Sequence, residues 1–351
     1  MVNSHYIPQF ILKNFYKNNK IQYCDIDNKT VESRNTRSVF AEKGYYPEQT
    51  EKNLCYKIER QFSILYHNKI ENPGNSVVLT EEELFILKKY LIISSLRFKY
   101  ECTESDQELI DQMGDSYKID FANNLNKALR TENSQDLYHL IGGVGVGKIF
   151  ASLMSGGQLN DEDVNVPLWA ETKDIVNSYI IFIKTSGTEK FIIPDMGKGI
   201  VEGPMSREKL MYCISNPMLL QISLLLTPHD YTIYPLTKDI AILSMSVFYK
   251  LFTDSQESRF YGVPAGFPAI HEMLGFGSKS DIEPPRVSRD GGKKTYRYKV
   301  NRLNNNDIAH FNCVMMTEAK HHIAFSDIGD ISYSLDRMAE YTDRDYNFLS
   351  Q

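Results

Sequence analysis

Apolar and polar residues repeat with different periods along the chain, and these periods predict a succession of strands and helices. From Lys20 to Thr30, apolar residues interrupt a polar setting up to Asp27-Asn28, which predicts a short strand, a turn and a second strand near Val31. From Glu51 to Ile70, apolar residues recur three or four positions apart, as on one face of a helix. The first third of the chain therefore changes from strand to helix.

The middle of the chain is predicted to be helical. Asn72-Pro73-Gly74 ends the first helical pattern. Thr80 then precedes three glutamates, a capping-box arrangement that predicts the start of a long helix running to Arg97. The segment Ser105 to Arg130 offers further helical material.

The second half of the chain has mixed patterns. Ile175–Lys184 and Lys190–Ile193 are rich in β-branched residues and are predicted to form a hairpin through Gly187. The remaining predictions are a helix, a strand, a long loop and a closing helix capped by an asparagine, at Met205–Thr227, Ile240–Phe248, Ser255–Gly292 and Asn304–Phe325.

This order favours an α+β fold over a regular alternation of strands and helices. We expect a β-containing N-terminal segment over residues 1–50, a helical region over 51–160, and a mixed α/β half over 161–351. The three segments are expected to pack together as one large domain, because 351 residues with 42% hydrophobic content can supply a sizeable core.

Composition narrows the class of protein. The formal net charge of -6 argues against a surface that is basic throughout, although it allows a local basic cleft. Five scattered cysteines, an odd number with no C-x-x-C pair, indicate reduced thiols. The longest apolar run, Pro217 to Leu226, is too short to span a bilayer, so we expect a cytoplasmic protein without membrane contact.

The run from His5 to Phe15 joins a polar pair to an aromatic and aliphatic spine. Pro8 restricts the residue before it to extended geometry, so His5 and Tyr6 should lead on a strand or turn into the segment that begins at Gln9. The run resembles the opening signature HYxPQFxLxxF of a bacterial family known as domain of unknown function 4238.

Further segments extend this resemblance at low density along most of the chain. Around Asp195 the chain resembles a family stretch F-I-T-S-D-N-P and keeps its carboxylate, although four neighbouring residues differ. Homologues are similar to genes in bacterial antiphage-defence islands, so the resemblance implies a defence role. The other resembling positions are Ala41–Tyr46, Lys57–Glu59, Arg97 in an L-R pair, and Tyr234–Thr237.

The polar residues at these positions form a candidate catalytic set: His5, Glu42, Glu59, Arg97 and Asp195. Such a set can supply a general base, metal-binding carboxylates for Mg²⁺ or Mn²⁺, and a cation that stabilises an anion, which suits phosphodiester hydrolysis. In this hypothesis His5 is the base and Arg97 clamps the phosphate. The alternative is structural, with His5 bonded to a backbone carbonyl and Glu59 paired with Arg97 between helices.

A stretch late in the chain alternates cations with tyrosines. On an extended strand, Tyr296 and Tyr298 would face one way while Arg297 and Lys299 face the other. One face could then stack on bases while the other contacts phosphates, although an ordinary amphipathic strand with a basic solvent face is favoured. The candidate nucleic-acid-binding residues are Lys293, Lys294, Tyr296, Arg297, Tyr298 and Lys299.

Two patterns resemble ligand sites less closely. Gly142–Lys148 fits the phosphate-loop spacing G-x-x-x-x-G-K, but Ile149 replaces the hydroxyl that would hold magnesium, which favours a glycine-rich connection. Glu318, His321 and His322 would share a face of the closing helix in a geometry that suits a divalent cation. Because His322 also lies on the apolar stripe of that helix, a core or interface histidine is favoured.

Two main function classes remain open from the sequence. The first is an antiphage-defence protein with nuclease activity on RNA or DNA, and the second is a non-catalytic sensor that recognises a phage component. The partner of the protein would be nucleic acid or that phage component. A third and weaker option is a nucleotide-dependent switch that uses Gly142–Lys148. Serine hydrolase, zincin and dinucleotide-binding motifs are missing from the sequence, so those enzyme classes are unsupported.

Overall fold

The computed structural model describes residues 3–44, 48–96, 179–201, 231–245, 286–290, 293–338 and 346–350. Within these ranges the chain forms a two-stranded, a seven-stranded and a four-stranded sheet together with helices. The α+β class predicted from the sequence is therefore confirmed.

The N-terminal signature is built on a strand, a proline and a helix. β1 (Asn3–His5) pairs antiparallel with β4 (Ala41–Lys43). Pro8, in extended geometry at φ -57° and ψ 137°, precedes α1 (Gln9–Leu12), which continues as the 3-10 turn η1 (Lys13–Phe15). This arrangement confirms the expectation that an extended lead enters the Gln9 segment.

A hairpin follows, as the polar and apolar pattern predicts. β2 (Ile21–Asp25) pairs antiparallel with β3 (Thr30–Arg34). The Asp25 carboxylate accepts hydrogen bonds of 2.9 Å from both the backbone and the side-chain nitrogen of Asn28, which fixes the turn. The 3-10 turn η2 (Thr36–Ser38) then leads into β4.

One helical stretch runs from Glu48 to Ile70 and alternates between α and π geometry. It ends shortly before Pro73, where the sequence predicts a stop. Its segments are α2 (Glu48–Asn53), η3 (Leu54–Glu59), α3 (Arg60–Leu65) and η4 (Tyr66–Ile70).

The predicted capping box starts the next helix. β5 (Ser76–Thr80) leads directly into α4 (Glu81–Leu96). The Thr80 backbone nitrogen donates to Glu83 Oε2 at 2.8 Å, and the Glu83 backbone nitrogen donates to Thr80 Oγ1 at 3.2 Å. These two bonds satisfy backbone N–H groups at the helix start that have no partner within the helix.

The largest sheet joins segments that are far apart in the sequence. Its strand order is β11-β12-β6-β10-β9-β8, and β5 pairs with β12 in addition. All its pairs are antiparallel except the parallel pair of β12 with β6. The strands are β6 (Tyr179–Thr185), β8 (Gly199–Val201), β9 (Tyr231–Pro235), β10 (Ile240–Met245), β11 (Arg286–Asp290) and β12 (Lys293–Leu303).

The long strand β12 changes its buried face at Val300. Tyr296, Tyr298 and Val300 are buried with period two, whereas the next buried residues are Asn301 and Leu303. The change coincides with a change of partner, since β5 pairs as far as Lys299 and β6 pairs from Val300 onwards. The first part of β12 therefore exposes the opposite set of side chains, including its cations.

The four-stranded sheet has the order β3-β2-β13-β7, with β13 at His322–Phe325 and β7 at Ile193–Pro194. This order contradicts the predicted hairpin through Gly187, because β6 and the strand after it belong to different sheets. β7 pairs instead with β13, and β6 pairs with β10 and β12. The first predicted segment contains a strand, β6, whereas residues 190–192 are not in a strand and only Ile193 of the second segment falls in β7. The partners of β6 and β7 lie far away in the sequence.

The closing helix is shorter than the sequence predicts. α14 (Asn305–Glu318) begins with Asn304 as the cap, whose side chain accepts from the Asp307 backbone nitrogen at 3.1 Å. It ends at Glu318, and β13 follows at His322, so the helix predicted through Phe325 is wrong in its last turns. The remaining elements are η7 (Ile328–Ile331), α15 (Ser332–Arg337) and η9 (Asn347–Ser350).

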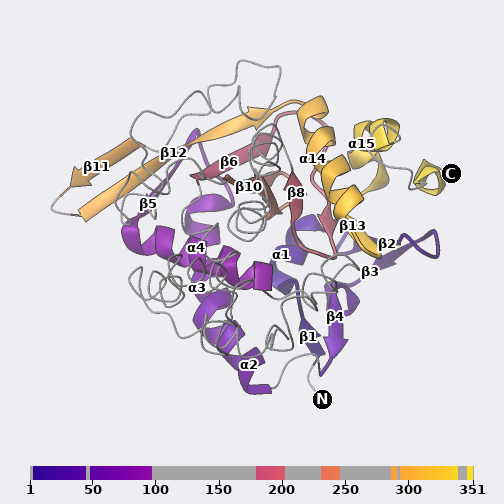
Figure 1. Ribbon diagram of the computed structural model, residues 1–351, viewed down its shortest axis with the longest axis horizontal. Coiled ribbons are helices and arrows are strands. Elements are labelled where there is room, and N and C mark those ends of the chain that lie inside the picture. Colours follow the sequence, from indigo (N-terminus) through magenta and orange to yellow (C-terminus); the bar gives the residue numbers. More distant parts are fainter. Residues whose placement is uncertain are drawn as a thin grey trace, which may run out of the picture.

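In Figure 1, helices α3 and α4 lie to one side of the large sheet, and α14 and α15 lie towards the other end of the molecule beside β8 and β13. One continuous core of buried residues connects these parts. The predictions for residues 105–130, 142–148 and 205–227, and most of the predicted loop 255–292, lie outside the described residues. The described part of that loop is the strand β11, so the loop prediction is wrong there.

Candidate functional site

The polar residues of the N-terminal signature are bonded to each other and to a nearby backbone. His5 is 8% exposed, and its Nε2 lies 3.3 Å from the Thr36 carbonyl oxygen and 3.2 Å from Gln9 Nε2. The Tyr16 hydroxyl lies 3.0 Å from Thr36 Oγ1 and accepts from the Thr36 backbone nitrogen at 3.2 Å. The contact of His5 with a carbonyl is the structural alternative that the sequence left open.

The apolar residues of the signature form part of the core. The Phe10 ring lies within 6.5 Å of the rings of Phe62, Tyr66 and Tyr90, measured between centroids. The fully buried members of the signature are Ile7, Ile11, Leu12 and Phe15. The signature therefore attaches the first strand to the helical layer.

The other members of the predicted catalytic set lie elsewhere or are not described. Glu42 pairs in register with Ser4, so side-chain alternation along the strands places Glu42 and His5 on opposite faces. Glu42 is exposed, and Glu59 is half-buried at the end of η3. Arg97 lies outside the described residues. His5 and Glu42 thus do not share a site.

Asp195 has a clear role in shaping the backbone. It is 8% exposed, and its carboxylate accepts hydrogen bonds from the backbone nitrogens of Lys320, His321 and His322 at 3.0, 2.7 and 3.0 Å. Its own backbone nitrogen donates to the His322 carbonyl at 2.9 Å. Asp195 therefore fixes the backbone that carries two consecutive histidines.

These two histidines each face an aspartate on the β2 hairpin. His321 Nδ1 lies 2.7 Å from Asp27 Oδ2, and His322 Nε2 lies 3.7 Å from Asp25 Oδ2. The centroids of the two imidazole rings are 6.1 Å apart. We call these four residues the histidine–aspartate cluster. Hydrogen bonds from Asn28 hold the pKa of Asp25 below its ordinary value, so this aspartate stays ionised.

A tyrosine of β2, Tyr23, packs against the histidine–aspartate cluster. The His322 ring stacks on Tyr23 with centroids 4.8 Å apart, and the Arg34 guanidinium lies 4.4 Å from the centre of the same ring. Because β13 and β3 flank β2 on its two sides, Tyr23 lies between the histidine and the arginine. Burial raises the pKa of Tyr23, so its hydroxyl stays protonated.

The metal hypothesis for the closing helix is wrong in its geometry. Glu318 ends α14, whereas His321 and His322 lie beyond the helix, so the three residues do not share a helical face. Within the described part of the chain, no group of three histidine, cysteine or acidic side chains is arranged to hold a metal ion. The phosphate-loop pattern at 142–148 falls outside that part.

The basic stretch on β12 is a strand, as predicted, but its tyrosines cannot stack on bases. Tyr296 and Tyr298 are 1% and 3% exposed, so the stacking part of the prediction is wrong. Arg297 and Lys299 are exposed, as is Lys293. The favoured alternative, an amphipathic strand with a basic solvent face, is the arrangement observed.

Lys294 and Arg297 contact neighbouring elements of the fold. Its Nζ lies 3.4 Å from Glu81 Oε1 at the start of α4, so part of its charge is neutralised there. Arg297 donates from Nη1 to Ser76 Oγ at 3.0 Å on the neighbouring strand. These contacts orient the cations along the sheet surface.

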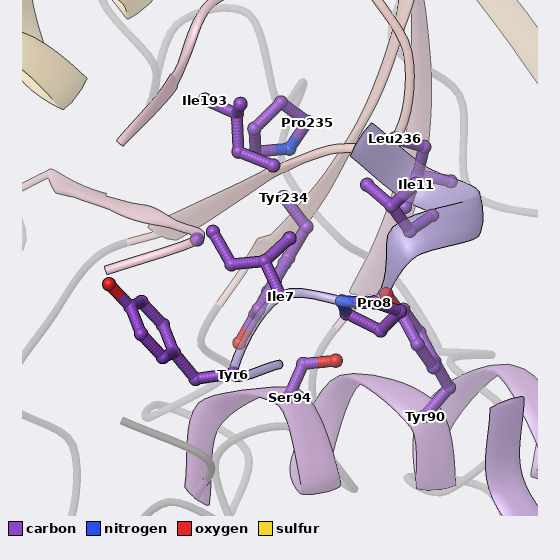
Figure 2. A pocket seen from close by; sticks show the side chains of 11 residues that line it. Tyr6, Ile7, Pro8, Ile11, Tyr90, Ser94, Ile193, Tyr234, Pro235 and Leu236 are labelled. Carbon is purple, nitrogen blue, oxygen red and sulfur yellow. The ribbon is translucent and has the colours of Figure 1, made fainter. Parts of the chain in front are cut away.

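A small cavity lies where the family-like segments meet. Its volume of about 20 Å³ is room for about one water molecule. Figure 2 shows Ile7 and Pro8 of the signature between Ser94 and Tyr90 of α4 and the segment Tyr234 to Leu236, with Ile193 beside them. The family-like segments thus pack against each other here, and the cavity between them is too small for a substrate.

A second buried carboxylate was missed from the sequence. Glu189 is 1% exposed and accepts from the backbone nitrogens of Tyr333 and Ser334, both at 3.0 Å, at the start of α15. Asn312 donates to the Lys190 carbonyl at 2.7 Å beside it. Burial raises the pKa of Glu189 although these hydrogen bonds act against the shift. This network joins α14 to α15 and is structural.

Sequence reasoning also missed Asp25 and Asp27 as partners of the two histidines. The available signal was the Asp27-Asn28 turn, which predicted a hairpin but gave no sign of its neighbour. The bond from His321 to Asp27 spans 294 positions, and such pairing depends on the register of β13 beside β2.

Comparison with known proteins gives one match. A family model described as "Protein of unknown function (DUF4238)" matches residues 3–328. No curated protein and no solved structure matches the chain. Over the described residues, no helix is long and apolar enough to cross a membrane.

Proposed function

The chain belongs to the DUF4238 family of proteins of unknown function, and we propose that this member is a nucleic-acid-binding protein of bacterial antiphage defence. The defence role rests on the resemblance to genes of antiphage-defence islands. The binding role rests on one observation, the row of exposed cations Lys293, Arg297 and Lys299 on the first part of β12. We call these three residues the basic strip.

The spacing of the basic strip suits a phosphate backbone. A strand rises about 3.4 Å per residue, so Arg297 and Lys299 are separated by roughly 6.8 Å along the strand. Two cations at this separation can each contact a phosphate of the same nucleic-acid strand. The half-buried Thr295 lies between them and Lys293 in the same row.

Neighbouring strands extend the surface around the strip. The register of the sheet places Arg286 of β11 beside Arg297, and Ser76 of β5 beside Lys299. Because the whole chain carries a formal charge of -6, a polyanion is attracted to this local surface and repelled by the acidic remainder. The strip therefore also sets the orientation of binding.

The test is the salt dependence of binding by a strip variant. R297A/K299A removes two phosphate contacts, so the slope of log affinity against log salt for a single-stranded RNA should fall by about 1 to 2. The matched control K57A/R60A removes two exposed cations from the helix at 48–70 and should leave the slope unchanged. Equal slopes for wild type and R297A/K299A, or an equal effect of the control, would refute the proposal.

Binding by the strip is compatible with both function classes, a sensor of phage nucleic acid and a nuclease. One observation favours the nuclease, namely the histidine–aspartate cluster with its two adjacent imidazoles. The original catalytic set is not what supports it, since His5 is held inside the signature and Asp195 is bonded to backbone.

A further inference from the structure

We propose that His321 and His322 form a general acid–base pair that cleaves single-stranded RNA without a metal ion. This inference rests on the proposed nucleic-acid-binding function and adds a substrate class and a site to it. Three features carry it: the distance between the imidazoles, the aspartate facing each of them, and the rigid backbone beneath.

The distance between the rings suits a single phosphodiester. Cleavage of RNA by its own 2′-hydroxyl needs a base on one side of the phosphorus and an acid on the other, each within about 3 Å of an oxygen. Two rings with centroids 6.1 Å apart and planes inclined at 62° can address two oxygens of one phosphate group. A lone surface histidine cannot do so.

His321 has the arrangement of a general base. Its Nδ1 lies 2.7 Å from Asp27 Oδ2, so Nδ1–H donates to the carboxylate and Nε2 carries the lone pair. The side chain is 52% exposed, so a substrate can approach the ring. Asp27 acts as a positioning residue that selects this tautomer.

His322 has the arrangement of a general acid. Its Nε2 lies 3.7 Å from Asp25 Oδ2, so this aspartate can orient the ring. Stacking on Tyr23 fixes the ring plane, and the side chain remains 28% exposed. Arg34, on the other side of Tyr23, holds that ring in place and is itself bonded to Glu32 at 2.7 Å.

The step conserves atoms and electrons. His321 takes the proton of the 2′-hydroxyl, the 2′-oxygen forms a bond to phosphorus, and the bond from phosphorus to the 5′-oxygen breaks. His322 gives its proton to that leaving 5′-oxygen. The products are a 2′,3′-cyclic phosphate and a free 5′-hydroxyl, with no oxidant or metal required.

Asp195 makes the pair rigid. Its carboxylate accepts from the backbone nitrogens of both histidines and of Lys320, which holds the two Cα positions relative to β7. Catalytic pairs need such support because small displacements of either group cost much of the rate. A surface ion pair that merely joins two strands would not need it on consecutive residues.

The experiment uses the full-length protein and a fluorescent uridine-rich RNA 20-mer with EDTA present. The RNA should be cleaved to products ending in 2′,3′-cyclic phosphate, and its 2′-deoxy counterpart should stay intact. H321A and H322A should each lower the rate by about 100-fold or more. Lack of RNA cleavage by the wild type, metal-dependent cleavage of the deoxy strand, or wild-type rates in both variants would overturn the inference.

His67 supplies the matched control. It is 53% exposed and pairs with Glu71 at 3.0 Å, as His321 pairs with Asp27. Unlike His321, it stands on a helix outside the histidine–aspartate cluster. H67A should cleave at the wild-type rate. D27N should keep the fold, lower the rate and displace one limb of the pH–rate profile, which an ion pair that only joins strands would not produce.

Two further measurements separate folding and binding from cleavage. H322N keeps a polar group near the position of a ring nitrogen, and its urea midpoint shows whether loss of activity reflects unfolding. Affinity for the deoxy 20-mer should be the same in wild type and H321A. If wild type binds this strand but leaves the RNA intact, the acid–base inference fails and the proposed function survives; if neither strand is bound, the proposed function fails.

The pH profile is expected to be bell-shaped, because one histidine acts neutral and the other charged. The ionisable and charged groups near the pair include Asp25, Asp27, Asp195, Tyr23, Arg34 with its partner Glu32, and Lys320. A rate that rises or falls monotonically across the range in which histidine titrates would contradict the assignment of opposite roles.

Discussion

His5 and His321 occupy opposite kinds of surroundings, although both lie next to short strands of small sheets. His5 is buried, and its ring contacts the Thr36 carbonyl and Gln9 in the centre of the signature. His321 is half exposed and contacts one carboxylate at the edge of the four-stranded sheet. The first histidine has its polar atom engaged in holding the fold, while the second leaves a nitrogen for a substrate.

The contrast teaches that a recognisable motif and a reactive site need not coincide. The signature HYxPQF supplies buried rings and one internal hydrogen-bond network, so its residues are constrained by packing. Asp195 belongs to a family-like segment, and its carboxylate holds the backbone of the exposed histidines. Perturbing each region separately tests this division.

The largest expected effect is that of D195A on stability. The substitution leaves three backbone N–H groups without their acceptor in a site that is 8% exposed, and we expect a loss of about 3 kcal/mol or more. Urea denaturation followed by circular dichroism measures it. A loss below about 1 kcal/mol would mean that water replaces the carboxylate and that Asp195 does not hold the histidines.

The next effect concerns His5, where stability and chemistry should separate. H5A removes a buried ring that contacts the Thr36 carbonyl, and we expect a loss of about 1 to 2 kcal/mol. H321A removes only an exposed side chain and its bond to Asp27, so its loss should stay below about 1 kcal/mol. Denaturation midpoints and RNA cleavage rates are measured together. A stable but inactive H5A variant would return His5 to the catalytic set.

The sequence was informative wherever an element depends on its own neighbours. Thr80 and Glu83 form the capping box because the two residues face each other within one helical turn. The β2–β3 hairpin follows from the turn at Asp25 to Asn28, and the cap of α14 from Asn304. In each case a contact spanning three positions decides the structure.

Contacts between distant segments could not be obtained in this way. β7 pairs with β13 and β12 pairs with β6, so each strand finds a partner more than a hundred positions away. The apolar character of Ile193 is the same in a hairpin as in a separate sheet. Between α14 and β13 the sequence has no glycine or proline that would signal the end of the helix. Periodicity reports burial but not the partner that buries a strand.

The same limit applies to the candidate site. His321 and His322 were visible as a pair, yet the spacing suggested a helical metal site with Glu318. The aspartates that face them come from the β2 hairpin near the other end of the chain. The sheet order β2-β13 alone makes these four residues neighbours. The residue pattern within one segment does not show which distant segment will lie beside it.

The smallest expected effect lies at His310 and sharpens the comparison between stability and activity at acidic pH. Burial lowers the pKa of His310 below its ordinary value of 6.5, the nearby Arg337 acts in the same direction, and Asp307 opposes it. The unfolded chain therefore binds a proton more readily than the folded chain, so stability should decrease as the pH falls through 6.5 and level off below the folded pKa.

Replacing this residue by H310Q removes that proton uptake. Unfolding free energies of wild type and H310Q should follow parallel lines above pH 7 and diverge below pH 6.5, with wild type losing more stability. The cleavage profile of H310Q should keep the shape of the wild-type profile, because His310 belongs to α14 and not to the histidine–aspartate cluster. If H310Q changed both the stability curve and the cleavage profile, the fall in rate at acidic pH would reflect protonation of His310 and loss of folded protein. That fall could then not be assigned to His321.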